Sequence, residues 1–312
     1  MTAPDPAPDS PSALAPPIDP ARLVADLVTL LRLDQQDADR FIGQSEDIGT
    51  PRVFGGQVLG QSLMAACRTV GAERPVHSLH AYFLLPGDKS EPIEYLVDRV
   101  RDGRSFTTRR VVAQQKGRTI FTMMASFQTV EPGAFSHQQT MPDAPAPETL
   151  VSDAQLRRAL GSRAPFGMND KFLLERPIEF RTVDPPDLLA PKPRPAEALI
   201  WMRALTALPD DPALHCALLA YASDHGLLRA AMLPHGLSFM HARLRPASLD
   251  HAMWFHRNFR LDDWLLYAID SPSGGGARGL CRGEIFSRDG RLVASVAQEG
   301  MLRVVDTDAT PG

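Results

Sequence analysis

The chain repeats one order of elements in its two halves, and this repetition limits the folds open to it. Each half has an apolar stretch long enough for a buried helix, followed by several strand-like runs. The predicted helices run from Gln57 to Val70, after Gly55-Gly56, and from Asp211-Pro212 to near Gly226. The strand-like runs lie at 76–85, 93–100, 105–115 and 118–130, and then near 239–245, 253–259, 264–269, 278–287 and 291–305.

Short stretches of the two halves also match in sequence. Gly117-Arg118 aligns with Gly290-Arg291, each at a predicted hairpin turn, and His80-Ala81 resembles His251-Ala252. One helix laid on an antiparallel sheet, used twice, is the economical interpretation. We therefore predict an α+β protein of two similar units, each a helix on an antiparallel sheet, with the sheets paired edge to edge.

Proline-rich stretches predict the boundaries of these units. The first twenty residues are rich in proline and poor in large apolar side chains, which is typical of a disordered tail, and Asp19-Pro20 has the pattern of a helix start. The stretch from Glu131 to about Ala146 is again rich in proline and polar residues. We predict a tail at 1–20, a first unit at 21–130, a linker at 131–170, a second unit at 171–305 and a C-terminal tail at 306–312.

Composition excludes several classes of protein. A formal net charge of −4 argues against a nucleic-acid binder that relies on a strongly basic whole-protein field. Cys67, Cys216 and Cys281 lie far apart and form no CxxC pair, so neither a disulfide scaffold nor a zinc site is expected. No apolar run approaches the roughly 18 residues that span a bilayer, and no signal peptide is visible. We expect a soluble, cytoplasmic protein.

Two glycine-rich motifs resemble nucleotide-binding sites but lack an essential feature of them. Residues 55–62 have the glycine spacing of a phosphate loop, but Gln61 occupies the position of the required lysine. Residues 274–279 fit a dinucleotide-binding pattern, but a strand-like run follows where a helix must begin. The chain also lacks the G-x-S-x-G motif that carries the nucleophilic serine of α/β-hydrolases. We therefore predict no bound nucleotide, metal or other cofactor.

Five segments together carry a resemblance to a known family. They read RVFGGQVLGQSLMAA (52–66), YASDHGLL (221–228), ASLDHAMWFHR (247–257), WLLYAIDSPSGGGARG (264–279) and GEIFSRDGRLVASVAQEGMLR (283–303). From about Leu23 to about Val304 the chain closely resembles the TesB-like acyl-CoA thioesterase II family. The resemblance implies a double hotdog fold, in which two antiparallel sheets each wrap a long helix, in agreement with the two-unit prediction.

The resemblance also implies a catalytic trio in the second unit. The family's aspartate, hydroxyl residue and glutamine fall on Asp224, Ser248 and Gln298. Threonine is common in the family at the middle position; serine keeps the hydroxyl but lacks the methyl group that restricts its rotamers. Ala125 aligns with Gln298, and the first helix has no carboxylate between Gln57 and Val70. We therefore expect one working site per chain.

These residue types suit thioester hydrolysis. Asp224 can act as a general base on water, a role that typically contributes about 10²–10⁴-fold, and Ser248 and Gln298 can bond the same water. Backbone N–H groups near Gly56 and Gln57, at a helix start, are the predicted donors to the developing oxyanion. Direct attack by Asp224 to form an anhydride is the alternative mechanism. Water activation is favoured because it needs no covalent step.

Other residues are candidates for holding the substrate. Arg278, beside the glycine-rich loop, is a candidate for the CoA phosphates, with a solvated strand edge as the simpler interpretation. Met123, Met124, Phe127 and Met253 are candidates for lining an acyl tunnel, with ordinary core as the alternative. Four histidines form no metal-binding spacing and are interpreted as structural or hydrogen-bonding residues: His225, His235, His251 and His256.

The predicted function is hydrolysis of fatty acyl-CoA, of medium to long chain, to free fatty acid and CoA, in a homodimer or homotetramer as the resemblance implies. Two alternatives stay open: a non-catalytic acyl-CoA-binding hotdog protein and an enoyl-CoA hydratase. The trio argues against a pure binding protein, which has no need of all three residues. The hydratase needs an aspartate and a histidine aimed at one alkene, whereas the adjacent Asp224 and His225 project apart.

Overall fold

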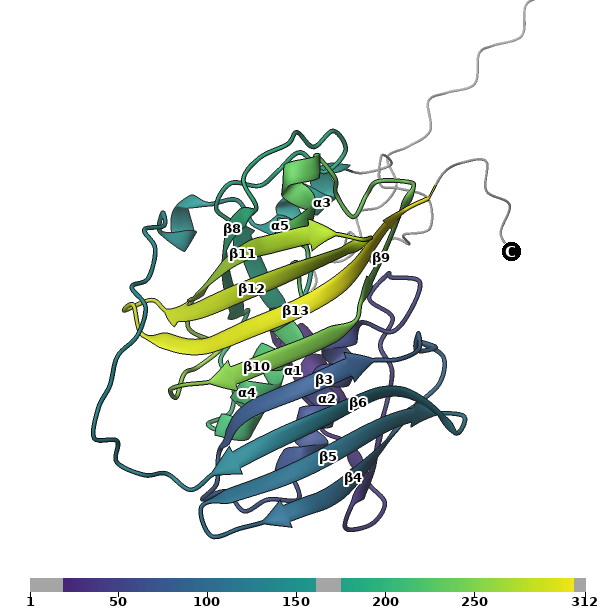
Figure 1. The fold of residues 1–312 in the computed structure, drawn as a ribbon, viewed down its shortest axis with the longest axis vertical. Helices are drawn as coiled ribbons and strands as arrows, with labels where there is room; N and C mark the ends of the chain where they lie inside the picture. The colour runs from purple at the N-terminus through teal and green to yellow at the C-terminus, as the bar shows by residue number, and fades with distance from the viewer. Residues whose placement is uncertain (1–18, 161–174, 306–312) are drawn as a thin grey trace, which may run out of the picture.

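One continuous antiparallel sheet forms the body of the molecule (Figure 1). The computed structural model describes residues 19–160 and 175–305. The strand order is β1-β2-β4-β5-β6-β3-β10-β13-β12-β11-β8-β7, and β9 pairs with β13 beside this path. The strands of the first half therefore lie on one side of the β3–β10 pair, and those of the second half lie on the other.

The elements of the first half are α1 (Pro20–Leu31), β1 (Asp34–Gln35), β2 (Arg40–Gly43), α2 (Gly55–Cys67), β3 (Val76–Phe83), β4 (Ile93–Asp102), β5 (Phe106–Gln115) and β6 (Arg118–Gln128). A 3₁₀ turn at Pro147–Thr149 and the helix α3 (Asp153–Leu160) follow. The second half contains β7 (Ile178–Thr182), β8 (Glu197–Ala204), α4 (Pro212–Ser223), α5 (Arg229–Met232), a 3₁₀ turn at Leu233–His235, β9 (Leu244–Ser248), β10 (Asp250–Phe255), β11 (Leu265–Gly275), β12 (Arg278–Ser287) and β13 (Leu292–Val304).

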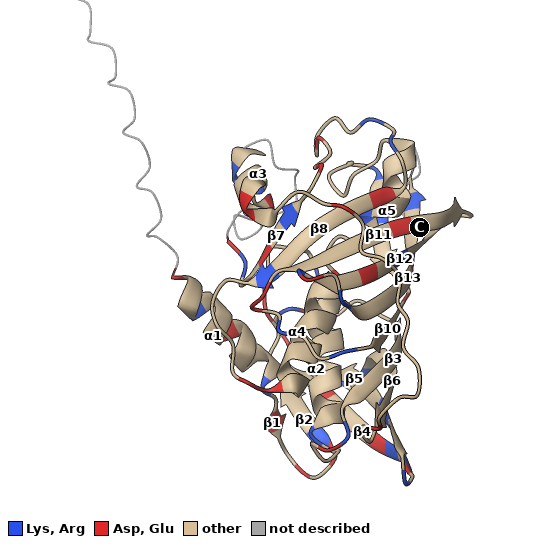
Figure 2. Ribbon diagram, turned by 90° about the vertical axis from the view of Figure 1, so that its left-hand side faces the viewer, with Lys and Arg blue, Asp and Glu red and all other residues tan. Residues whose placement is uncertain are grey.

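Two central helices, α2 and α4, lie against one face of the sheet, and α1 lies outside them (Figure 2). Both central helices are buried along most of their length, which agrees with their largely apolar sequences. The predicted helix starts are confirmed: Asp19 Oδ1 accepts a hydrogen bond from Ala21 N at 2.9 Å, and Asp211 Oδ1 accepts one from Ala213 N at 3.0 Å.

Glycines allow α2 and α4 to pack closely. A Cβ atom at Gly56 would lie 2.3 Å from the carbonyl oxygen of Tyr221, and one at Gly60 would lie 2.9 Å from that of Ala217. Only a residue without a side chain fits at such a distance from a backbone. The first turn of α2 therefore lies against the last turn of α4, although the two helices belong to different halves of the chain.

The strands β3 and β10 join the halves and correct one detail of the predicted repeat. Ala81 lies opposite His251, and both side chains are buried, whereas His80 lies opposite Ala252 and is exposed. The alignment of His80-Ala81 with His251-Ala252 is therefore wrong by one residue, because a shift of one residue in a strand moves a side chain to the opposite face. The edge-to-edge pairing of the two sheets is confirmed.

The second half differs most from the predicted elements. The strands β7 and β8 were not predicted, and the run near 239–245 becomes a strand only from Leu244. Both predicted hairpins are confirmed, since Lys116, Gly117 and Gly290 have the positive φ angles of 50°, 72° and 85° that tight turns require. The four proposed tunnel residues do not share a face: Met123, Phe127 and Met253 are buried, but Met124 is exposed.

The unit boundaries stay predictions. Within the predicted linker 131–170, residues 153–160 form α3, which is tied to the sheet because Asp153 accepts hydrogen bonds from the N–H and hydroxyl of Thr182. Residues 161–170 of that linker and 171–174 of the predicted second unit lie outside the described residues, as do 1–18 and 306–312 of the predicted tails.

Candidate active site

Asp224 stands at the end of α4, where the buried helix reaches the first turn of α2. It is the C-cap residue, still in right-handed helical conformation, and its side chain is partly buried. The buried helix α4 therefore carries the carboxylate to the junction of the two halves. A Cβ atom at Gly55 would lie 2.7 Å from Asp224 Oδ2, so this oxygen faces the N-terminus of α2.

Ser248 and Gln298 reach the same carboxylate from two neighbouring strands. Gln298 Nε2 donates to Asp224 Oδ1 at 3.0 Å, and the Ser248 hydroxyl donates to the same oxygen at 3.4 Å. Ser248 at the end of β9 pairs with Gly300 of β13, two residues beyond Gln298. The alternation of side chains along β13 places Gln298 on the inner face, where it is buried. The structure thus brings together the three residues that the motifs indicated.

The start of α2 supplies backbone donors beside Asp224. The first N–H groups of a helix have no partner within it, and the N-cap residue Phe54 makes no side-chain capping bond. The N–H of Gln57, however, already donates to the carbonyl of Phe54 at 3.1 Å. The N–H groups of Gly55 and Gly56 have no partner within the helix, and the helix dipole favours negative charge at this end.

The side chain of Gln57 has a structural role in this arrangement. It is buried, its Oε1 accepts from Glu46 N, and its Nε2 donates to Gln44 O and to Gln61 Oε1 at 3.0 and 3.1 Å. These bonds hold the chain segment that precedes α2. The N–H and the side chain of Gln57 are thus both engaged in hydrogen bonds, and the oxyanion role of Gly56 and Gln57 stays a prediction.

Arg278 is not brought to Asp224. Its neighbour Gly279 faces inward, because a Cβ atom there would lie 2.5 Å from Ala231 Cβ, so Arg278 projects from the outer face of the sheet. Its Nε forms an ion pair with Glu299 Oε1 at 2.9 Å, and both side chains are largely exposed. This geometry matches the solvated strand edge that was the alternative interpretation.

A buried hydrogen-bond chain lies behind Gln298; the sequence predicted a structural or hydrogen-bonding role for His251 but not its partners. His251 Nδ1 lies 3.3 Å from Gln298 Oε1, and His251 Nε2 lies 3.0 Å from the Ser223 hydroxyl oxygen. The hydroxyl of Tyr267 donates to the carbonyl oxygen of Ser223 at 3.1 Å. Burial lowers the pKa of His251 below its usual value, while the nearby charge of Asp224 acts in the opposite direction. The available signal was the step Asp250-His251 in the motif that holds Ser248.

His225 points away from the carboxylate beside it in sequence. Its ring stacks on Phe180 of β7 with ring centroids 4.1 Å apart. Burial lowers its pKa well below the usual value, and the charges of Arg157, Arg229 and Arg176 lower it further. The expected divergence of Asp224 and His225 is therefore seen in the structure.

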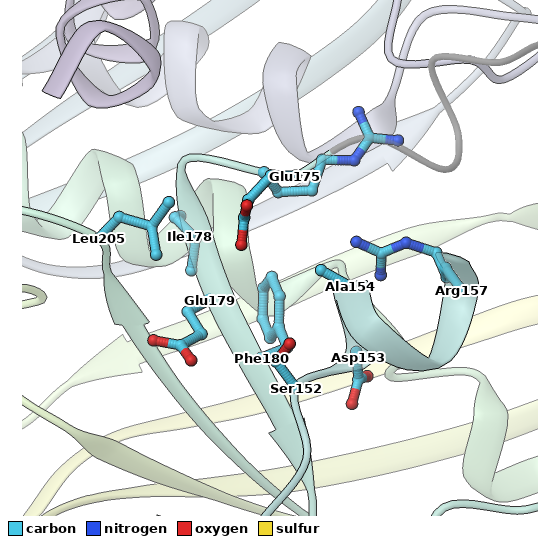
Figure 3. Close-up of a pocket in the computed structure, with 10 residues that line it drawn as sticks. Ser152, Asp153, Ala154, Arg157, Glu175, Ile178, Glu179, Phe180 and Leu205 are labelled. Atoms are coloured by element: carbon cyan, nitrogen blue, oxygen red, sulfur yellow. The ribbon is translucent and has the colours of Figure 1, made fainter. Parts of the chain in front are cut away.

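A separate small pocket lies between α3 and β7 (Figure 3). Its volume of about 10 Å³ has room for about one water molecule. It is lined by Asp153, Arg157, Glu175 and Glu179 among others, and by none of the residues that contact Asp224. Among the described residues, no group of three or more His, Cys, Asp or Glu side chains could hold a metal ion, and no helix is long and apolar enough to cross a membrane.

Comparison with known proteins decides the family. Residues 168–301 match the family described as acyl-CoA thioesterase, and residues 43–128 match its N-terminal domain. The chain is 41% identical to acyl-CoA thioesterase 2 of Haemophilus influenzae, over 90% of this chain and 98% of that protein. It is also 41% identical to acyl-coenzyme A thioesterase 8 of Homo sapiens, over 89% of each. The chain belongs to the acyl-CoA thioesterase family.

Solved structures agree with this assignment. The acyl-CoA thioesterase II TesB2 of Mycobacterium marinum is 45% identical and superposes with a TM-score of 0.73, covering 90% of this chain and 99% of that one. A hot dog fold protein of Alicyclobacillus acidocaldarius, 19% identical with a TM-score of 0.71, has the same fold. The comparisons confirm the predicted resemblance and the double hotdog fold. They also confirm the predicted enzyme class, which is a thioester hydrolase.

Proposed function

We propose that this thioesterase hydrolyses fatty acyl-CoA by means of a water molecule activated by Asp224. One observation carries the proposal: Ser248 and Gln298 both donate to Asp224 Oδ1, while Oδ2 faces the start of α2. Two donors hold the carboxylate in one orientation, and no donor from the described part of the chain bonds its second oxygen. A carboxylate oriented in this way suits a general base.

The reaction follows from this arrangement. Asp224 Oδ2 takes a proton from water as the water oxygen attacks the thioester carbonyl carbon. The carbonyl oxygen becomes an oxyanion and accepts hydrogen bonds from the N–H groups of Gly55 and Gly56, beside the positive end of the helix dipole. The C–S bond then breaks, and the leaving CoA sulfur takes up the proton from Asp224. The products are the free fatty acid and CoA with its thiol protonated, and Asp224 is again a carboxylate.

Apolar side chains beside the site support a medium to long acyl chain as the substrate. The ring of Phe83 lies 3.0 Å from the position of a Cβ atom at Gly55. Leu84 and Leu85 follow Phe83 directly and are exposed, so that three large apolar side chains stand together beside the site. An acyl chain laid along this segment would cover them.

The alternative functions have weaker support. A pure acyl-CoA-binding protein does not need a carboxylate held by two donors. An enoyl-CoA hydratase needs a histidine that reaches the substrate, but His225 stacks away from Asp224, and both ring nitrogens of the fully buried His251 have protein partners.

The proposal is tested by thiol release from acyl-CoAs of increasing chain length. Asp224→Asn keeps the shape of the side chain but removes the base, so we expect kcat to fall by about 10²-fold or more while acyl-CoA binding persists. Asp211→Asn, at the other end of the same helix, is the matched control, because asparagine also caps helices well. An Asp224→Asn enzyme with undiminished turnover would contradict the assigned base. Binding without turnover by the unmodified protein would favour the binding function.

We also propose that the chain works as a homodimer or homotetramer in the cytoplasm. Apolar side chains on the outer face of β3, β6 and β10 are exposed, namely Tyr82, Met124 and Trp254, and suit contact with a second copy. The three cysteines are free, as expected in a reducing compartment. We expect light scattering to give a multiple of the 34.1 kDa chain mass and Trp254→Arg to lower it; an unmodified protein that is monomeric at micromolar concentration would contradict association.

A further inference from the structure

The orientation of the Gln298 amide matters for the proposed base. A carboxylate can only accept hydrogen bonds, so Nε2 of Gln298 must face Asp224, as the 3.0 Å contact shows. The amide oxygen Oε1 then points the opposite way, to His251 Nδ1 at 3.3 Å. An amide turned by 180° would place its oxygen against the carboxylate, and it would lose the bond that holds Asp224.

This orientation of the amide requires one tautomer of His251, and that tautomer in turn stabilises the orientation. Because Oε1 of Gln298 only accepts, His251 must carry its proton on Nδ1 to complete the chain. Nε2 then accepts the hydroxyl proton of Ser223 at 3.0 Å. The Ser223 hydroxyl also lies 2.9 Å from the carbonyl oxygen of Ala220, so its one proton can go to either acceptor. In the other tautomer the proton goes to Ala220, Nε2 donates to Ser223, and the lone pair on Nδ1 faces Oε1. Burial lowers the pKa of this ring and so favours the neutral form, in which one nitrogen carries no proton.

The first half of the chain lacks both members of this contact. Ala125 is the counterpart of Gln298, and both are buried on the inner face. Leu79 of β3 lies opposite Ala125 of β6. His251 and Gln298 are related in the same way, because each directly adjoins a member of the Ala252–Ala297 pair of β10 and β13. The half without the carboxylate thus has two apolar residues where the half with the carboxylate has a histidine and a glutamine.

We propose that Ser223 and His251 form a buried positioning relay, which fixes the Gln298 amide in the orientation that donates to Asp224. His251 is fully buried and contacts the carboxylate only through Gln298, so it is a positioning residue and not a catalytic one. The proposal rests on the proposed function of Asp224 as the base. The relay acts on the rate of the chemical step and leaves substrate binding nearly unchanged.

Three substitutions test the relay. The amide nitrogen of asparagine lies as far along the side chain as Nδ1, and that of glutamine as far as Nε2. His251→Asn can therefore keep the bond to Gln298, whereas His251→Gln can keep only the contact with Ser223. We expect His251→Gln and Ser223→Ala to lower kcat by about tenfold or more, the effect of one hydrogen bond, with KM within about twofold. We expect His251→Asn to stay within about threefold of the unmodified enzyme.

Ser62→Ala is the matched control for Ser223→Ala. Ser62 is also fully buried in a central helix, but its hydroxyl has no hydrogen-bond partner in the described part of the chain, so its kcat should not change. In a Gln298→Ala background, Ser223→Ala should have no further effect on kcat, since the relay acts only through Gln298. Melting temperatures of all variants show whether a loss of activity is a loss of folding.

The possible outcomes separate the relay from the proposed function. Unchanged kcat in both Ser223→Ala and His251→Gln, with Asp224→Asn inactive, overturns the relay and leaves the base in place. Equal losses in His251→Asn and His251→Gln also overturn it, as does a second loss in the Gln298→Ala background. Full activity of Asp224→Asn overturns the proposed base, and with it the relay.

Discussion

Ser248 and Gln298 hold Asp224 at different distances, and this difference predicts the order of their effects. The bond from Ser248 is 3.4 Å long, near the limit of a hydrogen bond, whereas that from Gln298 is 3.0 Å. We expect Ser248→Ala to lower kcat by about 3- to 10-fold and Gln298→Ala by about 10- to 100-fold. Ser248→Thr should keep or raise kcat, because the methyl group restricts the rotamers of the hydroxyl. Steady-state rates of the three variants check this order, and a larger loss from Ser248→Ala than from Gln298→Ala would refute it.

The same residues show how far a sequence can predict a site. Asp224, Ser248 and Gln298 stand in recognisable motifs, so their proximity could be expected. Their neighbours depend on the face of a strand or on a partner far along the chain. Arg278 differs from the inward Gly279 by one position, and the contact of His251 with Gln298 exists only because β10 and β13 are paired. Neither the outward direction of Arg278 nor the contact between His251 and Gln298 can be deduced from the spacing of the motifs.

At the scale of elements, the contact between α2 and α4 gives two adjacent glycines different roles. A Cβ atom at Gly55 meets the side-chain oxygen of Asp224, whereas one at Gly56 meets the backbone oxygen of Tyr221 at 2.3 Å. We expect Gly55→Ala to lower kcat by about tenfold or more with little change in melting temperature, because it displaces the base. We expect Gly56→Ala to cost about 1–3 kcal/mol of unfolding free energy, because it forces the helices apart.

Gly275→Ala is the control for both glycine variants, since nothing lies within 4 Å of a Cβ atom at that position. Thermal unfolding and kcat are measured on all three proteins. Equal effects of Gly55→Ala and Gly56→Ala on stability would contradict the separate roles.

The missed elements have a physical explanation. In β7 the buried residues Ile178, Phe180 and Thr182 alternate with partly exposed ones, but the strand has only five residues and follows a proline. The strand β8 comes directly after a proline-rich stretch, which is typical of a loop. Short strands of this kind become stable by pairing with neighbours, which local sequence does not show. The long strands and the two central helices have a recognisable hydrophobic pattern in their own sequences, and for that reason they were predicted.

At the scale of the whole molecule, buried histidines predict sensitivity to acid. Burial lowers the pKa of three that are enclosed by the protein, His215, His225 and His251. A histidine with a folded pKa below the ordinary 6.5 takes up protons more readily when the chain is unfolded. The stability of the fold is therefore present above pH 6.5 and falls as the pH drops below it, by at most about 1.4 kcal/mol per pH unit for each fully shifted group.

Denaturant unfolding between pH 7.5 and pH 5 measures this loss. We expect the unfolding free energy to decrease with decreasing pH, and His225→Gln to make that decrease shallower. A free energy that does not change over this range, or a slope unaffected by the substitution, would contradict the assignment.

The pairing of β3 with β10 has a consequence for the chain while it is being made. Strands β4, β5 and β6 are complete early, and β6 covers one edge of β3, but the other edge needs β10. At about 5–20 residues per second, the ribosome reaches Asp250 roughly ten seconds or more after Phe83. During this interval the unpaired N–H and C=O groups of β3 can pair with the same strand of another nascent chain. We therefore expect any aggregation during synthesis to begin at the same seam that joins the finished enzyme, and to depend on the speed of translation.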